Sequence, residues 1–178
     1  MVENMEKERT ACFSGYRPHK FDFPLVGEEY ENFIAKLYLE IAKVINRGFN
    51  RFIVGCTPGM DIISAELVIL AKQDYAGRGI QLICALPFGG FRNSRHFDMH
   101  WRKRYYEIMK HSDETINVTD SHSWNRGCYD KRNKFMVDNS SLLICYSTGV
   151  SGGTENTIKY AKDKGVEIIN ISTNVSLA

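Results

Sequence analysis

Short apolar runs alternate along the chain with longer segments in which apolar residues recur every three or four positions. The short runs have the length of strands and are bounded by glycine, proline and other turn residues. Such bounded apolar runs are typical of buried strands. The predicted strands are residues 11–14, 51–54, 80–86, 114–118, 141–146 and 166–171.

The longer segments carry their apolar residues at helical spacing. Phe33, Leu37, Ile41 and Val44 follow one another in this way, and Gly48 stands where a helix ends. The predicted helices are residues 28–47, 61–75, 91–111, 131–139 and 154–164. Strands that alternate with helices predict an α/β fold, a Rossmann-like three-layer sandwich with a mostly parallel central sheet.

The composition fits one ordinary globular domain, with 43% hydrophobic and 25% charged residues among 178. We expect residues 1–10 to form a flexible tail and residues 11–178 to form a single domain. No apolar stretch approaches the ~20 residues of a membrane helix, and the polar N-terminus is no signal peptide. The five cysteines form no CxxC pair, so we expect buried free thiols, no metal site and a cytoplasmic location.

A glycine-rich loop follows the predicted strand 141–146. Gly149, Gly152 and Gly153 precede Thr154 and Thr157 at the start of a helix. Glycines let backbone amides approach an anion closely, and a helix start offers free N–H groups and a partial positive charge. The loop therefore predicts a phosphate or carboxylate cradle, although it also suits a plain strand-to-helix connection.

Glycine loops also follow the first two predicted strands. Gly15 precedes Arg17, which suits bidentate contact with a phosphate or an ion pair with a nearby acid. Asp61 follows the second loop and either caps a helix or accepts hydrogen bonds from a ribose. A further glycine loop, with Gly89 and Gly90, follows the third predicted strand. Loops that leave the carboxyl ends of parallel strands meet at one edge of the sheet, so we expect the loops after the first, second, third and fifth strands to converge. The second loop contributes Gly55, Thr57 and Gly59 to the predicted site.

Basic and aromatic residues interleave between residues 92 and 134, a segment with ten basic and six acidic residues. This pattern occurs in nucleic-acid binding proteins, and more often in amphipathic helices with a solvated face. Phe88, after the third predicted strand, either stacks on a base or forms an apolar rim. Arg132 and Asn133 lie near a predicted helix start, where they could reach a ligand. No GxGxxG or GxxxxGK[ST] motif occurs, which argues against a common dinucleotide fingerprint and a P-loop.

Several segments in this order resemble the YpsA-like family of the SLOG superfamily: GYRP, GCTPGMD followed by AE, RNKFMVD, and GGTENT. The resemblance covers residues 11–171. It implies a Rossmann-like fold that senses a nucleotide or nucleotide-derived ligand, such as ADP-ribose, NAD or a nucleoside monophosphate. The family positions correspond here to Gly15, Arg17, Gly55, Gly59, Asp61, Glu66, Arg132, Asn133, Gly152, Gly153, Thr154 and Thr157.

The resemblance leaves two other functions open. Relatives in the LOG branch hydrolyse nucleoside monophosphates and carry a PGGxGTxxE motif, whose final glutamate is replaced here by Tyr160. Glycoside cleavage needs a carboxylate beside the sugar, and Asp61 and Glu155 are the catalytic candidates. DprA relatives bind single-stranded DNA, so a nucleic-acid or protein-interaction module is the second alternative. Aromatic residues between 91 and 106 could also form a homo-oligomer interface.

Overall fold

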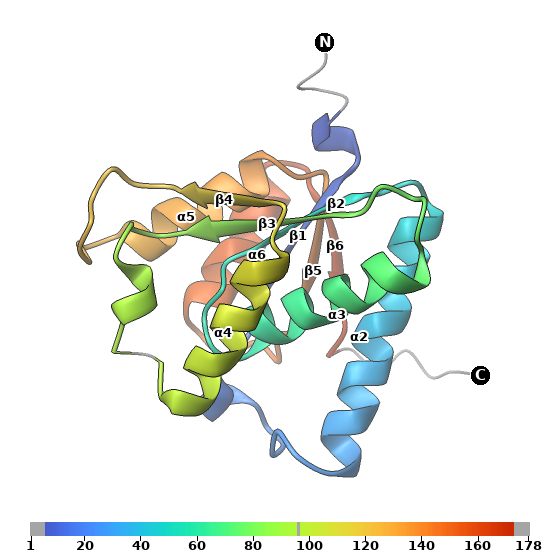
Figure 1. Cartoon of the computed structure of the whole chain (residues 1–178), viewed down its shortest axis with the longest axis horizontal. Helices are drawn as coiled ribbons and strands as arrows, with labels where there is room; N and C mark the ends of the chain where they lie inside the picture. The colour runs from blue at the N-terminus through green and yellow to red at the C-terminus, as the bar shows by residue number, and fades with distance from the viewer. Residues whose placement is uncertain (1–5, 96, 173–178) are drawn as a thin grey trace.

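The computed structural model describes residues 6–95 and 97–172; the rest of the predicted tail and domain lies outside these residues. Six parallel strands form one sheet in the order β4-β3-β2-β1-β5-β6 (Figure 1). The α/β class and the Rossmann-like sheet predicted from the sequence are therefore confirmed. The strands are β1 Thr10–Ser14, β2 Arg51–Val54, β3 Gln81–Leu86, β4 Glu114–Asn117, β5 Leu142–Cys145 and β6 Glu167–Asn170.

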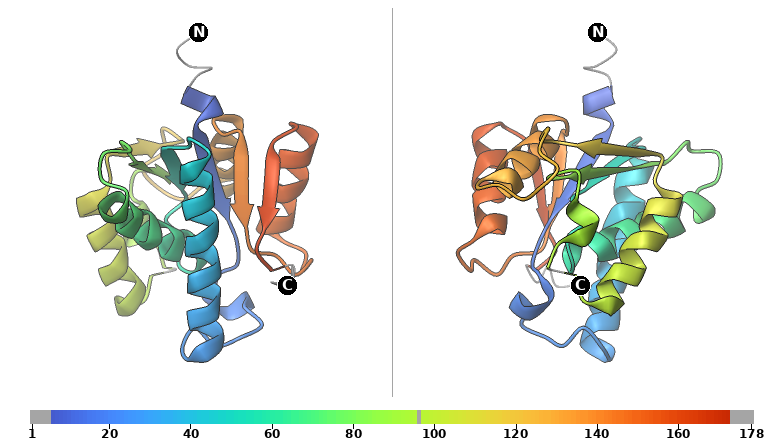
Figure 2. Two further views of the ribbon diagram at one scale, coloured as in Figure 1. Left: turned by 90° about the vertical axis from the view of Figure 1, so that its right-hand side faces the viewer. Right: turned by 60° about the vertical axis from the view of Figure 1, so that its left-hand side comes forward.

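Two layers of helices cover the sheet, one on each face (Figures 1 and 2). The first layer consists of α2 Glu28–Asn46, α3 Met60–Asp74 and α4 Met99–His111. The second consists of α5 Cys128–Asp138 and α6 Gly153–Asp163. Short 3-10 turns follow β1 at Pro18–Lys20 and β3 at Phe91–Asn93.

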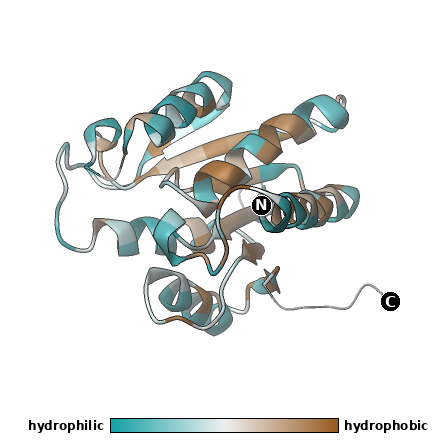
Figure 3. Cartoon of the chain, turned by 90° about the horizontal axis from the view of Figure 1, so that it is seen from below, coloured by the Kyte–Doolittle hydropathy of each residue, from teal (hydrophilic) through white to brown (hydrophobic). Residues whose placement is uncertain are grey.

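Alternate residues of each strand face opposite helix layers, as the pleat of a strand requires. Phe13 and Phe52 pack into the core below α2, α3 and α4, whereas Cys12 and Ile53 pack against α5 and α6. The strands between the two helix layers are accordingly coloured mainly brown, the colour of hydrophobic residues, in Figure 3. All five cysteines are buried and free, as predicted, and burial raises the pKa of the Cys12 thiol to about 12.

Two predicted helices begin elsewhere in the structure. Helix α4 begins at Met99 rather than at residue 91, because the Asp98 side chain accepts a hydrogen bond of 2.9 Å from the Trp101 amide and caps the helix there. Helix α5 begins at Cys128, after a turn in which Gly127 has a φ of 85°. Thr10, assigned to the tail from the sequence, is a buried residue of β1.

The strand order leaves a crevice at one edge of the sheet. From β1 the chain adds β2, β3 and β4 in one direction, and then returns to place β5 on the other side of β1. Connections that leave β1 and β5 therefore run to opposite faces of the sheet, and ligands of such folds bind between them at the carboxyl ends. Within residues 6–95 and 97–172, no helix is long and apolar enough to cross a membrane.

Candidate functional site

A cleft of about 320 Å³ lies at the carboxyl edge of the sheet, between the loops that follow β1, β2 and β5. It contains eight of the ligand-binding residues predicted from the sequence. The loops after β1, β2 and β5 thus converge as expected, whereas the loop after β3 does not line this cleft. The residues that line this cleft are Phe13, Ser14, Gly15, Tyr16, Arg17, His19, Lys20, Thr57, Asp61, Tyr129, Arg132, Asn133, Gly153 and Thr154.

A buried ion pair lies at the cleft. The Nη1 atom of Arg132 is 3.3 Å from Oδ2 of Asp61, and the two side chains are only 5% and 8% exposed. Asp61 also accepts hydrogen bonds from the amide of Thr57 at 3.2 Å and from its hydroxyl at 2.5 Å. Arg132 in turn has a buried Nε atom with no hydrogen-bond partner among the described residues. The guanidinium is therefore held by Asp61 through Nη1, while its Nε–H group lacks an acceptor among the described residues.

Gly55 makes room for this ion pair. A Cβ atom at position 55 would lie 1.4 Å from Nη1 of Arg132 and 2.6 Å from Oδ2 of Asp61. Any larger residue would therefore displace the guanidinium or its carboxylate. Gly55 supports the cleft from below and is not among the residues that line it.

Positive charge prevails in the cleft. Arg17, Lys20 and Arg132 line it, against the single carboxylate of Asp61. The guanidinium carbons of Arg17 and Arg132 lie 5.4 and 5.9 Å from the centroid of the Tyr129 ring, within cation–π range. A cleft with this excess of cations suits an anionic ligand.

The side chain of Lys20, from the 3-10 turn after β1, reaches the first residues of α6. A Cβ atom on Gly152, the residue that precedes this helix, would lie 2.8 Å from the Nζ atom of Lys20. No side chain caps the helix, so its first amides and partial positive charge face the same region as the lysine.

Tyr16 connects the loops on the two sides of the crevice. Its hydroxyl accepts hydrogen bonds from the amides of Thr148 at 2.8 Å and Val150 at 3.2 Å. It also shares hydrogen bonds with the hydroxyls of Ser147 and Thr148. Burial raises the pKa of Tyr16, but these hydrogen bonds outweigh burial and leave that pKa lowered.

Tyr16 is not among the site residues predicted from the sequence, although it stands between two of them, Gly15 and Arg17. Its position in the GYRP segment was the only available signal, because Ser147 and Thr148 are 131 and 132 residues away along the chain.

Other predicted residues lie outside the cleft and support its frame. Gly59 precedes α3 with a φ of 98°, and a Cβ atom there would lie 2.3 Å from the carbonyl oxygen of Tyr16. The Thr157 hydroxyl donates to the carbonyl of Gly153 at 2.8 Å, within α6. These contacts hold the backbone around the cleft. Neither Gly59 nor Thr157 lines the cleft itself.

The two acidic residues predicted in addition to Asp61 are engaged elsewhere. Glu66 forms an ion pair of 2.6 Å with Arg104 of α4. Glu155 accepts a hydrogen bond from the hydroxyl of Ser147. Neither residue lines the cleft. Among the described residues, no group of three or more His, Cys, Asp or Glu could hold a metal ion.

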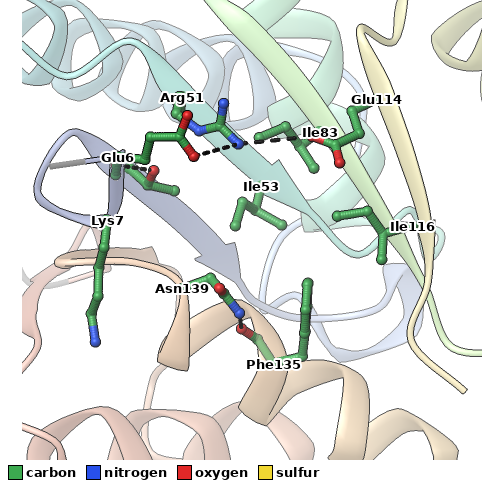
Figure 4. Close-up of a pocket in the computed structure, with 10 residues that line it drawn as sticks. Glu6, Lys7, Arg51, Ile53, Ile83, Glu114, Ile116, Phe135 and Asn139 are labelled. Atoms are coloured by element: carbon green, nitrogen blue, oxygen red, sulfur yellow. Dashed lines mark hydrogen bonds and ion pairs between the residues drawn. The ribbon is translucent and has the colours of Figure 1, made fainter. Parts of the chain in front are cut away.

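A cavity of about 600 Å³ lies at the amino ends of the strands (Figure 4). Its arginine, Arg51, lies between Glu6 and Glu114, at 4.0 and 3.7 Å. Ile53 and Ile83 form the apolar part of its wall. Acidic partners already balance its arginine, so the cleft at the carboxyl edge is the better candidate for an anion site.

Sequence comparison assigns the chain to a family. A family model described as the YspA SLOG family matches residues 11–174. The chain belongs to the YspA SLOG family. Among its relatives is UPF0398 protein BH1768 of Halalkalibacterium halodurans, 24% identical over 158 residues that cover 88% of this chain and 82% of the relative. The uncharacterized SPbeta prophage-derived protein YoqJ of Bacillus subtilis is 29% identical over 126 residues, 63% of this chain and 69% of YoqJ.

Structural comparison finds a similar fold in another protein. DNA processing protein A of Helicobacter pylori, whose structure concerns a single-stranded DNA binding mode, matches with a TM-score of 0.58. The match is 16% identical and covers 94% of this chain but only 66% of that chain. At this identity the likeness shows a common fold and nothing more specific.

Proposed function

We propose that the cleft binds a phosphate-bearing, nucleotide-derived ligand, in a regulatory sensing role. The observation that carries this proposal is Arg132, a guanidinium with a 5% exposed side chain and a buried Nε without a partner among the described residues. A buried cation is costly unless it is paired and hydrogen-bonded. An anion bound in the cleft would give the Arg132 guanidinium a second negatively charged partner beside the carboxylate of Asp61.

The start of α6 is the proposed phosphate position. A Cβ atom on Gly153 would meet no atom within 4 Å, so the space in front of this helix start is open. Helix starts bind phosphate through free amides and the helix dipole. Thr154 supplies a hydroxyl in the same place, and Lys20 supplies a charge. Arg17, on the loop after β1, would neutralise a second phosphate oxygen.

ADP-ribose, NAD and AMP-like nucleotides all carry the phosphate groups that this cleft suits. Asp61 already accepts hydrogen bonds from Thr57 and Arg132. We therefore assign Asp61 the role of positioning Arg132, in place of the ribose contact that its location next to a glycine loop suggested.

Lys20 tests the phosphate position. We expect Lys20→Ala to weaken the affinity for AMP or ADP-ribose about fivefold, because a charge at an exposed rim contributes roughly 1 kcal/mol. Titration calorimetry of the full chain measures this directly. The matched control is Lys164→Ala, which also removes one lysine charge but at the far end of α6, where Lys164 pairs with Asp138 at 3.7 Å. Equal affinities for the two variants would refute the assignment.

Hydrolysis of the ligand is the alternative to binding alone, and the two candidate carboxylates argue against it. Asp61 is held by Thr57 and Arg132, and Glu155 is bonded to Ser147 outside the cleft. We expect chromatography to recover AMP, ADP-ribose and NAD unchanged after prolonged incubation with the protein. Release of a free base that falls with Asp61→Asn or Glu155→Gln would establish a hydrolase instead.

A further inference from the structure

A second cavity, of about 480 Å³, adjoins the cleft between the loops that follow β3 and β4. We call it the aromatic cavity, after Phe88, Trp124 and Tyr129, which line it. Asn93, Arg95 and His122 add polar groups to its wall. Both loops leave the carboxyl edge of the sheet, on the left of Figure 1.

The aromatic cavity and the cleft share the ring of Tyr129, which lines both. The Phe88 ring lies 6.5 Å from it, centroid to centroid, in an edge-on arrangement. The guanidinium groups of Arg17 and Arg132 lie over the same ring from the cleft. An anion site and an aromatic site are thus separated by the width of one aromatic side chain.

Backbone contacts hold the frame of the aromatic cavity. The amides of Gly89 and Gly90 donate to the carbonyls of Ser121 and His122, at 2.9 and 2.7 Å. A Cβ atom on Gly90 would lie 2.5 Å from the carbonyl oxygen of His122, so only glycine permits this close approach. The two loops therefore form one unit, and the cavity between them is preformed, as ligand sites commonly are.

Trp124 is the exposed part of this cavity. Its side chain is 62% exposed, although it lines an apolar space, whereas Phe88 is only 4% exposed. An exposed indole beside an apolar cavity offers a large flat face against which an aromatic ligand can pack. Bases stack on such side chains through their π-faces.

We propose that the aromatic cavity receives the base of the ligand whose phosphate occupies the cleft. The ligand thus carries both a phosphate group and an aromatic base. Phe88 and Trp124 contact the faces of the base. Asn93 and His122 supply polar groups that would form hydrogen bonds with its edge. This inference rests on the proposed function, since it places the second part of the same ligand.

The test compares ligands with and without a base. We expect Trp124→Ala to weaken AMP and ADP-ribose at least tenfold and to leave ribose 5-phosphate, which has no base, unchanged. The matched control is Tyr106→Ala, which removes a 44% exposed aromatic side chain of α4 that lines neither cavity. All titrations use the full chain, and thermal unfolding shows that each variant is folded.

Fluorescence gives a second measurement that does not depend on a loss of affinity. The chain has two tryptophans, and Trp101 is buried at 7% exposure. AMP is expected to quench the emission of the parent protein. It should not quench that of Trp124→Phe, in which the aromatic contact remains and binding is retained.

Two results would overturn the inference while leaving the phosphate site intact. The first is an AMP affinity that responds to Lys20→Ala but not to Trp124→Ala, which would place the base elsewhere. The second is binding of a short thymidine oligonucleotide with no binding of AMP, which would replace a mononucleotide by single-stranded DNA. If AMP, ADP-ribose and ribose 5-phosphate all fail to bind, the proposed function itself is wrong.

Discussion

Asp61→Ala is expected to lower the free energy of unfolding by about 3–5 kcal/mol, because it leaves the buried guanidinium of Arg132 without its carboxylate. The Arg132 side chain is only 5% exposed, so it has little contact with water that could take the place of the carboxylate. The amide and hydroxyl of Thr57 lose their acceptor in the same step. For a chain of this size the change corresponds to a fall of about 6–20 °C in the midpoint of thermal unfolding.

Urea denaturation followed by circular dichroism measures this loss. The control is Glu167→Ala, which breaks the ion pair between Arg47 and Glu167, whose side chains are 44% and 47% exposed. Exposed pairs contribute less than about 1 kcal/mol. Asp61→Asn, which keeps an acceptor for Thr57, should fall between the two. A loss for Asp61→Ala no larger than that for Glu167→Ala would show that the buried pair does not stabilise the loops around the cleft.

Gly59→Ala is expected to destabilise the protein by about 3 kcal/mol, through two causes that add. The residue has a φ of 98°, which an L side chain adopts only under strain. The new Cβ atom would lie 2.3 Å from the carbonyl oxygen of Tyr16, a backbone atom that also accepts a hydrogen bond of 3.0 Å from the Met60 amide. The loop after β1 would therefore have to shift, and the affinity of the cleft for a nucleotide should fall with it.

Gly153→Ala makes the same chemical change at the start of another helix. Its Cβ atom meets nothing within 4 Å, so we expect the stability to stay constant or to rise by up to about 1 kcal/mol. Thermal unfolding of both variants measures the difference. Equal losses would mean that neither the positive φ nor the contact with Tyr16 determines the need for glycine at position 59.

The position of the cleft followed from the sequence through a rule of parallel sheets. Glycine loops after β1, β2 and β5 converge because all strands run in one direction. Gly15, Thr57 and Gly153 accordingly line one cleft. Glu66 was included by family resemblance alone, and it lies on another side of α3, paired with Arg104. The helical geometry that separates it from Asp61 by about 140° agrees with this position.

The amino-acid sequence by itself determined the alternation of strands and helices, the buried free thiols and the edge of the sheet that holds the cleft. These properties depend on the local periodicity of apolar residues and on the common direction of parallel strands, and short segments of sequence are enough to indicate both. The tertiary structure alone decided that Arg132 pairs with Asp61, that Tyr16 joins the loops across the crevice, and that Trp124 borders a cavity next to the cleft. The partners of these contacts are distant in sequence, 71 residues apart for Arg132 and Asp61, and burial in the folded chain selects them.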